Sequence, residues 1–315
     1  MGRWDAFSPI INLKVPGLRI QRDHDLTSRT SMRMQARAAI FATVESPFAL
    51  KLLMEKVREA EVPAFLLGGG ANTLFATSNF EGVVFTLGRS FANTAYLGGN
   101  FFRAGAATKL PTLIKNAREC NLMGLEFLTM VPGTVGGALA GNAGAGNWGL
   151  CDFVERVYLM TRDGFIACVE RNQFRYSYRH SELREAIILE ADFRLEPYNK
   201  YEAERRKKEF TDKKANQPYN LPSCGCIFKN PKGDKSAPLY AGKLIEESEL
   251  KGYNINSAAI SKGHANFMVN MGHSTGEDFL ALISFVQDTV HQRFNVELEL
   301  EVQIVGGPMN SVVLA

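Results

Sequence analysis

The chain has 315 residues, which is enough for two or three domains with substantial hydrophobic cores. Hydrophobic residues make up 45% and charged residues 22%, as in ordinary soluble globular proteins, and the formal net charge of +3 is too small to indicate a nucleic-acid partner. No apolar run reaches the roughly 18 residues of a membrane span, and the N-terminus lacks the apolar core of a signal peptide. We therefore expect a cytoplasmic protein with no nucleic-acid or membrane partner.

The cysteines argue against a secreted protein and against a metal centre. They are odd in number and scattered, unlike a disulfide framework. Cys224 and Cys226 are the single close pair, and no second pair of Cys or His residues follows at zinc spacing. The sequence therefore predicts free thiols and no metal site. The cysteines are Cys120, Cys151, Cys168, Cys224 and Cys226.

The first predicted elements are a helix and a short strand that lead into a glycine-rich loop. Residues 46–61 predict a helix that Ser46 caps and Pro63 ends. A short buried strand at 64–67 then runs into Gly-Gly-Gly-Ala-Asn at 68–72. Such a loop indicates either a phosphate cradle or simply a tight turn.

A second and longer glycine-rich run, at 124–152, is the most informative feature of the chain. It has too many glycines for the interior of a helix or strand, where each costs roughly 0.5–1 kcal/mol relative to Ala. Glycines let main-chain N–H groups crowd around a bulky anion such as a pyrophosphate. The spacing fits neither a P-loop nor a plain dinucleotide-binding fingerprint.

The rest of the chain mixes strands and helices. Strands and turns are predicted over 82–107, a helix over 111–120, a hairpin around Asp163-Gly164, a strand over 186–195 and a charged connecting helix over 198–214. Near the C-terminus, Ser274-x-x-Glu277 predicts a capping box before a helix, and residues 296–305 alternate as in a half-buried strand. Because no steady βαβ rhythm is present, we expect an α+β fold.

Seven pieces of sequence, in order along the chain, resemble one known family. They span roughly residues 26–306, and in this combination the chain resembles the UDP-N-acetylenolpyruvoylglucosamine reductases (MurB), flavoenzymes of peptidoglycan precursor synthesis. The short segment between Ser181 and Cys226 is similar to the compact, type II branch. The pieces are LGGGANTLF, GLEFLTMVPGTVGGALAGNAGAG, YRHS, SCGCIFKNP, AGKLIEESELKGY, HANFMVN and LELEVQIVG.

The resemblance implies a domain organisation. An FAD-binding domain of the vanillyl-alcohol-oxidase (PCMH) type would consist of two α+β subdomains, at about 1–87 and 88–198. A substrate-binding α+β domain would follow at 199–306, with a C-terminal tail at 307–315. We expect the end of the chain to return to the first subdomain, and we expect a monomer.

The resemblance also implies a two-stage redox reaction. NADPH would give a hydride to FAD, and the reduced flavin would give a hydride from N5 to the enolpyruvyl methylene carbon of UDP-N-acetylglucosamine enolpyruvate. Protonation of the neighbouring carbon would leave UDP-N-acetylmuramate. FAD would be held by the two glycine-rich loops, through Gly68, Gly69, Gly70, Ala71, Asn72, Thr73, Pro132, Gly133, Thr134, Gly136, Gly137, Asn142, Ala143 and Gly144.

Three residues match catalytic positions of the family. Arg179, in the Tyr-Arg-x-Ser motif, would bind the enolpyruvyl carboxylate with its guanidinium fork. Cys226 stands where the family usually has the serine that donates the proton, and a thiol, with a pKa of about 8.5, loses its proton more easily than a hydroxyl. Glu301, in Glu-Val-x-x-x-Gly, would hydrogen-bond the enolate, with its pKa raised by desolvation. Tyr178, Lys214 and Asn230 are the expected substrate contacts.

Without the resemblance, these residues also fit ordinary structural roles. Arg179 fits an exposed loop arginine, Cys226 a small buried apolar residue and Glu301 a solvated carboxylate. Cys224 fits a structural role, because it precedes the turn at Gly225. A flavin oxidase of the same fold, or a nucleotide-sugar binding protein without catalysis, remains an alternative function.

The chain departs from the family at one further place. Gln35 and Ala36 occupy positions where the family often has two glycines. The backbone there must therefore adopt φ values that ordinary residues tolerate.

Overall fold

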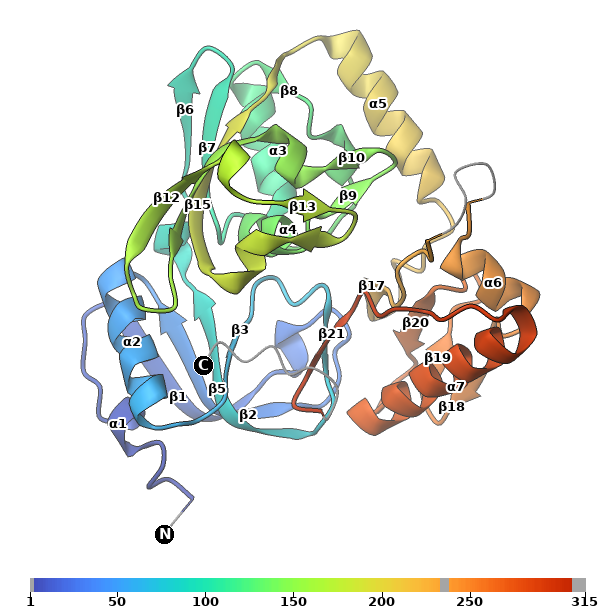
Figure 1. Ribbon diagram of the computed structural model, residues 1–315, viewed down its shortest axis with the longest axis horizontal. Helices are drawn as coiled ribbons and strands as arrows, with labels where there is room; N and C mark the ends of the chain where they lie inside the picture. Colours follow the sequence, from blue (N-terminus) through green and yellow to red (C-terminus); the bar gives the residue numbers. More distant parts are fainter. Residues whose placement is uncertain (1–2, 233–237, 308–315) are drawn as a thin grey trace.

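The computed structural model describes residues 3–232 and 238–307. Figure 1 shows three groups of strands and helices, from the first part of the chain, the middle and, on the right of the view, the last third. Two-stranded pairs are β8 (Leu122–Met123) with β16 (Glu196–Pro197), β9 (Gly144–Ala145) with β10 (Trp148–Gly149), and β13 (Tyr176–Ser177) with β14 (His180–Ser181). Short 3-10 helices lie at Thr27–Arg29, Arg89–Phe91, Glu126–Leu128, Leu150–Phe153, Arg171–Gln173 and Glu182–Glu185.

The first sheet has the strand order β1-β2-β5-β3. Strand β1 pairs antiparallel with β2, whereas β2 and β3 run parallel to β5. Helix α2 (Pro47–Glu59) packs its apolar side on one face, next to the short helix α1 (Ser8–Ile11). The N–H of Ala49 donates to Ser46 Oγ at 3.1 Å, which confirms the predicted cap. The strands are β1 (Leu18–Asp25), β2 (Arg37–Val44), β3 (Ala64–Leu66) and β5 (Asn79–Leu87).

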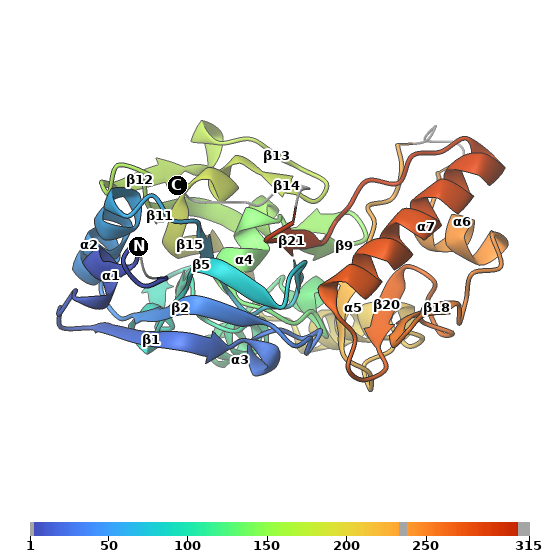
Figure 2. The same cartoon turned by 90° about the horizontal axis from the view of Figure 1, so that it is seen from below.

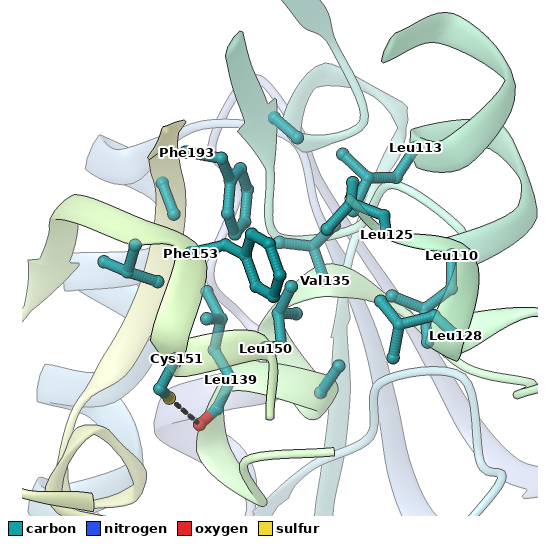
Figure 3. Close-up of a cluster of buried hydrophobic side chains, with 14 of the residues drawn as sticks. Leu110, Leu113, Leu125, Leu128, Val135, Leu139, Leu150, Cys151, Phe153 and Phe193 are labelled. Carbon is teal, nitrogen blue, oxygen red and sulfur yellow. Dashed lines mark hydrogen bonds between the residues drawn. The ribbon is translucent and has the colours of Figure 1, made fainter. Parts of the chain in front are cut away.

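The second sheet is antiparallel throughout, in the order β12-β11-β15-β7-β6. Helices α3 (Leu110–Glu119) and α4 (Val135–Ala140) cover one of its faces. Figure 3 shows part of this core, which contains Phe153, Phe193 and leucines from both helices, and in which Cys151 Sγ lies 3.6 Å from Leu139 O. The strands are β6 (Thr94–Gly98), β7 (Phe101–Gly105), β11 (Val154–Met160), β12 (Ile166–Glu170) and β15 (Ile187–Arg194).

Helix α5 (Lys200–Lys213) carries the chain from the second group of elements toward the third (Figure 1). There the sheet order is β17-β20-β19-β18, and α6 (Ala241–Glu247) and α7 (Gly276–Phe294) pack on one face around a core of their own. The strands are β17 (Ser223–Cys226), β18 (Asn254–Ile255), β19 (Ala258–Ile260) and β20 (Phe267–Asn270).

After α7 the chain returns to the first group of elements, as expected from the sequence. Strand β21 (Gln303–Val305) pairs in parallel with β4 (Thr73–Phe75), which directly follows the first glycine-rich loop. Figure 2 shows the chain crossing from α7 back to β21 beside this group. Strand β21, from near the C-terminus, thus completes the region around the first glycine-rich loop. Of the expected tail at 307–315, only residue 307 lies within the described residues.

Two predictions near the C-terminus are wrong in detail. The capping box of α7 is formed by Thr275 and Asp278, because Ser274 instead donates its hydroxyl to Asn270 Oδ1 at 2.9 Å. The predicted strand over 296–305 pairs as a strand only at β21, although its alternation correctly predicts which side chains are buried. Alternating apolar and polar residues show that one face of an extended segment is buried. A β-strand also needs a neighbouring backbone with which to form hydrogen bonds.

Among the described residues, no helix is long and apolar enough to cross a membrane. The same part of the chain contains no cluster of His, Cys, Asp and Glu residues suited to a metal ion. Gln35 and Ala36 are absent from the residues with positive φ, so the backbone there is compatible with side chains that carry a Cβ.

Candidate active site

The two glycine-rich loops lie against each other. A Cβ atom on Gly69 would sit 2.7 Å from Gly133 Cα, and one on Gly70 would sit 2.1 Å from the carbonyl oxygen of Arg29. Gly70 and Gly133 also have φ angles of +62° and +122°, in the region that favours glycine. Glycine is therefore required here by close backbone approach, and the two loops form one continuous cradle.

This cradle presents unpaired main-chain donors. The N–H groups from Gly68 to Asn72, and those of Gly133 and Thr134, donate to no other described residue. Near the second loop, the carbonyl of Thr108 accepts the N–H of Val135. The Thr108 side chain is buried, with 1% of the residue exposed, and its hydroxyl has no hydrogen-bond partner among the described residues. Clustered main-chain N–H groups bind phosphate oxygens well, so the cradle fits the pyrophosphate of FAD.

Other residues expected at the cofactor make contacts within the protein. Gly136 donates its N–H to Ala106 O, and the buried Asn142 donates to Ser177 O at 2.8 Å and accepts from the N–H of Cys151 at 3.1 Å. Gly144 faces the backbone of Trp148 in the β9–β10 hairpin, and the carbonyl of Ala143 accepts the N–H of Leu150. Their contact with FAD remains a prediction, as it does for Pro132, Thr73 and Gly137.

Arg179 is presented on the tight turn between β13 and β14. Its φ of +54° is unusual for a residue with a Cβ. The bond from Asn142 to Ser177 holds this hairpin against the glycine-rich run. From the turn, Arg179 Nε donates to Glu301 Oε1 at 2.6 Å, and the guanidinium carbon lies 5.1 Å from the centre of the Tyr178 ring. The strained turn thus aims the cation at the carboxylate from the far end of the chain.

Glu301 is held through its main chain as well as its side chain. Its N–H donates to Ile227 O at 2.8 Å, and its carbonyl accepts a hydrogen bond from Asn72 Nδ2 at 2.9 Å. Burial raises the pKa of the Glu301 carboxyl, and the neighbouring Arg179 charge opposes that rise. A carboxyl group in this setting can both accept and, when protonated, donate a hydrogen bond.

A β-bulge separates the two cysteines of β17. Ser223 lies opposite Val269 and Cys226 opposite Phe267, so three steps on β17 match two on β20. Gly225, with φ of +83°, provides the extra residue. Because opposite residues share a face of the sheet, the bulge leaves Cys226 on the face away from α7, whereas Cys224 belongs to the core beneath that helix. This agrees with a structural role for Cys224.

The Cys226 thiol lies within electrostatic range of both charged groups. Burial, which is the largest cause, and the Glu301 charge together raise its pKa to about 12, although the Arg179 charge opposes the rise. At neutral pH the thiol is therefore protonated. The structure thus brings together Arg179, Cys226 and Glu301, which are far apart in the sequence.

The expected substrate contacts surround this group. Tyr178 Oη accepts the N–H of Asn230 at 3.5 Å, and Asn230 Oδ1 accepts the N–H of Ala241 at 3.1 Å. Lys214 is buried, and its ammonium donates to the carbonyl oxygens of Phe127 at 3.2 Å and Thr129 at 2.5 Å. Burial and the Arg179 charge lower the pKa of Lys214 to about 8.

Tyr219 is an aromatic residue near the site that no sequence motif indicates. Burial and the Cys226 charge raise the pKa of Tyr219, so its phenol lies within electrostatic range of Cys226. It lies between α5 and β17, in a segment with no motif or periodicity. Only the fold brings it to Cys226, so no local pattern could have predicted it.

Comparison with known proteins decides the family. Residues 38–168 match "FAD binding domain", and residues 217–305 match "UDP-N-acetylenolpyruvoylglucosamine reductase, C-terminal domain". The UDP-N-acetylenolpyruvoylglucosamine reductase 2 of Symbiobacterium thermophilum is 35% identical over 297 residues, which cover 93% of this chain and 94% of that protein. The chain belongs to the UDP-N-acetylenolpyruvoylglucosamine reductase (MurB) family.

Other members of the MurB family agree. The reductase of Anaeromyxobacter sp. is 37% identical over 289 residues, covering 91% of this chain and 89% of that protein. The crystal structure of the MurB from Thermus caldophilus matches with a TM-score of 0.77 at 32% identity, covering 91% of this chain and 99% of that one. These matches confirm the resemblance and the α+β fold with an FAD-binding domain of the vanillyl-alcohol-oxidase type. Membership of the compact branch stays a prediction.

Membership of the MurB family also fixes the broad activity. The chain is an FAD-dependent oxidoreductase of peptidoglycan precursor synthesis, a UDP-N-acetylmuramate dehydrogenase.

Proposed function

We propose that this chain uses NADPH to reduce UDP-N-acetylglucosamine enolpyruvate to UDP-N-acetylmuramate, with Arg179, Cys226 and Glu301 acting on the enolpyruvyl group. One observation supports this proposal above all. An arginine, a protonated thiol and a buried carboxyl group lie near a cradle of N–H groups that donate to no other described residue, in a MurB family member. Bound FAD would supply the hydride, which it accepts from NADPH.

Arg179 would bind and orient the substrate carboxylate. Its Nε is bonded to Glu301, while its terminal nitrogens donate to no other described residue and remain available for a carboxylate. A guanidinium in this position stabilises the negative charge that develops on the enolpyruvyl group as hydride arrives. Glu301 fixes the guanidinium and, with its raised pKa, can hydrogen-bond the enolate oxygen.

Cys226 would supply the proton at sulfur. Its raised pKa keeps the thiol protonated until a basic carbon forms beside it. After transfer, the sulfur carries the negative charge next to Arg179, and it regains a proton from solvent. The thiol therefore suits the position that the family usually fills with serine.

The nucleotide part of the substrate needs positive charge and polar contacts. Tyr178 contacts both Arg179 and Asn230, and Lys214 lies within electrostatic range of Arg179, so we assign these three residues to substrate binding. Because two carbonyl oxygens hold the Lys214 ammonium, its contribution would be mainly the field of its charge. One chain supplies all three candidate catalytic groups, so the site needs no partner subunit, and we propose a monomer that acts in the cytoplasm.

Half-reaction kinetics test the role of Cys226. In Cys226→Ala, we expect NADPH to bleach the flavin at the wild-type rate, while reoxidation by UDP-N-acetylglucosamine enolpyruvate falls by at least about 100-fold, the lower end for a lost general acid. Cys226→Ser should retain substantial reoxidation, because a hydroxyl also donates a proton. Both rates are followed at the flavin absorption band in a stopped-flow spectrometer.

Two results would contradict the proposal. Normal reoxidation of Cys226→Ala by the sugar would remove the thiol from the mechanism. Wild-type protein that is reoxidised by dioxygen but never by the UDP-sugar would indicate an oxidase instead, and protein that binds no flavin would indicate a binding module.

A further inference from the structure

Asn72 joins the first glycine-rich loop to the segment that carries Glu301. Its side-chain Nδ2 donates to the Glu301 carbonyl oxygen at 2.9 Å, and its own carbonyl accepts the N–H of Gln303 at 3.0 Å. Beyond this point, β4 and β21 continue as a parallel ladder that starts with Thr73 opposite Gln303. The amide of Asn72 thus extends the ladder to the residue that bears the carboxylate.

The other side of Glu301 is fixed by the strand that bears the thiol. Its N–H donates to the carbonyl of Ile227, the residue after Cys226, and the N–H of Val302 points to the same oxygen at 3.3 Å. The main chain of Glu301 is therefore held between the cradle loop and β17. On the side of the cradle loop, the side chain of Asn72 makes the hydrogen bond that holds the Glu301 carbonyl.

We propose that Asn72 is a positioning residue for Glu301, whose side-chain amide holds the carboxyl group in register with the flavin cradle. This inference rests on the proposed function. The main-chain N–H of Asn72 donates to no other described residue, so one residue could serve the cradle through its backbone and the carboxyl group through its side chain. Loss of the amide should then slow the step that needs Glu301 and spare the step that does not.

Two variants separate this role from a contact with FAD. In Asn72→Ala, reoxidation of the reduced flavin by UDP-N-acetylglucosamine enolpyruvate should slow by about threefold to tenfold, the effect of one neutral hydrogen bond. Asn72→Asp should be slower still, because a carboxylate would face the Glu301 carbonyl oxygen. Flavin content and reduction by NADPH should stay within about twofold of wild type. Thr77→Ala is the matched control, since within the described part of the chain Thr77 Oγ1 donates only to the nearby Asn79 O.

A double variant tests whether Asn72 acts through Glu301. If it does, Asn72→Ala should add little to Glu301→Gln, so that the double variant is at most about twofold slower than Glu301→Gln alone. A second readout needs no activity: amide hydrogen exchange over residues 297–305 in the FAD-free protein should speed up in Asn72→Ala and remain unchanged in Thr77→Ala.

Several outcomes would overturn the inference. Loss of flavin, or slower reduction by NADPH, would show that the amide serves the cofactor. Fully multiplicative losses in the double variant, or wild-type kinetics and exchange in Asn72→Ala, would show that the amide does not position Glu301. A wild-type enzyme that the UDP-sugar cannot reoxidise would instead refute the proposed function, while the exchange experiment would still report on Asn72.

Discussion

At the scale of single residues, the site depends on charges that perturb one another. Arg179, Glu301 and Cys226 lie close enough for the carboxylate to raise the pKa of the thiol and for the guanidinium to lower it. Burial is the largest cause of the rise. The consequence is a sulfur that keeps its proton at neutral pH, which is the state a proton donor requires and the opposite of an activated nucleophile.

Removing the Glu301 charge should therefore make Cys226 more reactive. In Glu301→Gln, the pKa of the thiol should fall, and its alkylation by iodoacetamide at pH 9 should be about threefold to tenfold faster. Mass spectrometry of the peptide that contains Cys226 measures the rate. Glu299→Gln is the control, because Glu299 is exposed and pairs with Lys229. Equal rates in the two variants would show that the carboxylate does not act on the sulfur.

The residues of the site were predictable only in part from the chain itself. Nothing in the pattern around Arg179 or Glu301 separates them from ordinary surface charges, and the sequence motifs of the family identified them. Their meeting at 2.6 Å depends on a strained turn and on a strand that returns from the third group of elements to the first, which are long-range features. Tyr219 carries no motif at all, and so it could not be predicted.

At the scale of helices and strands, local signals predicted existence better than boundaries. The helix at Pro47–Glu59 and the hairpin at Asp163-Gly164 follow from caps and turns that involve neighbouring residues, and both are confirmed. The cap of α7 was misplaced by one residue because both Ser274 and Thr275 can accept a hydrogen bond. Only the fold shows that the Ser274 hydroxyl is already bonded to the side chain of Asn270, the last residue of β20.

The true cap of α7 gives a stability prediction. Thr275→Ala should lower the free energy of unfolding by about 1 kcal/mol, since the hydroxyl accepts the N–H of Asp278 at 3.2 Å. Glu277→Ala, which removes the glutamate of the capping box expected from the sequence, should change it by less than about 0.5 kcal/mol. Urea unfolding monitored by circular dichroism compares the two. A larger loss in Glu277→Ala would contradict the assigned cap.

At the scale of the whole molecule, polar side chains join the C-terminal elements to the rest. Asn270 Nδ2 donates to the carbonyls of Met32 and Arg33, at 3.1 and 3.2 Å, and Asn72 bonds Glu301. Lys214 connects the end of α5 to Phe127 and Thr129, at the start of the second glycine-rich run. These joints hold the candidate catalytic groups, which come from different parts of the chain, in one place.

The buried Lys214 ammonium should make the free energy of unfolding depend on pH. Its pKa is about 8 in the folded protein and near 10.5 when unfolded, so the unfolded chain binds more protons between these values. The free energy of unfolding should therefore rise with pH across this window, by at most about 1.4 kcal/mol per pH unit from this group. Urea titrations of wild type and Lys214→Met between pH 7.5 and 9.5 isolate the effect. A slope that survives in Lys214→Met would assign it to other groups.

The parallel pairing of β21 with β4 has a consequence for biosynthesis. The loop that would bind the flavin is translated well before β21, because the second and third groups of elements lie between them in the sequence. A nascent chain therefore carries the loop without the strand that brings Glu301 to it. The finished catalytic centre can therefore assemble only after β21 has emerged, so the flavin-binding loop waits for two later groups of elements before its surroundings are complete.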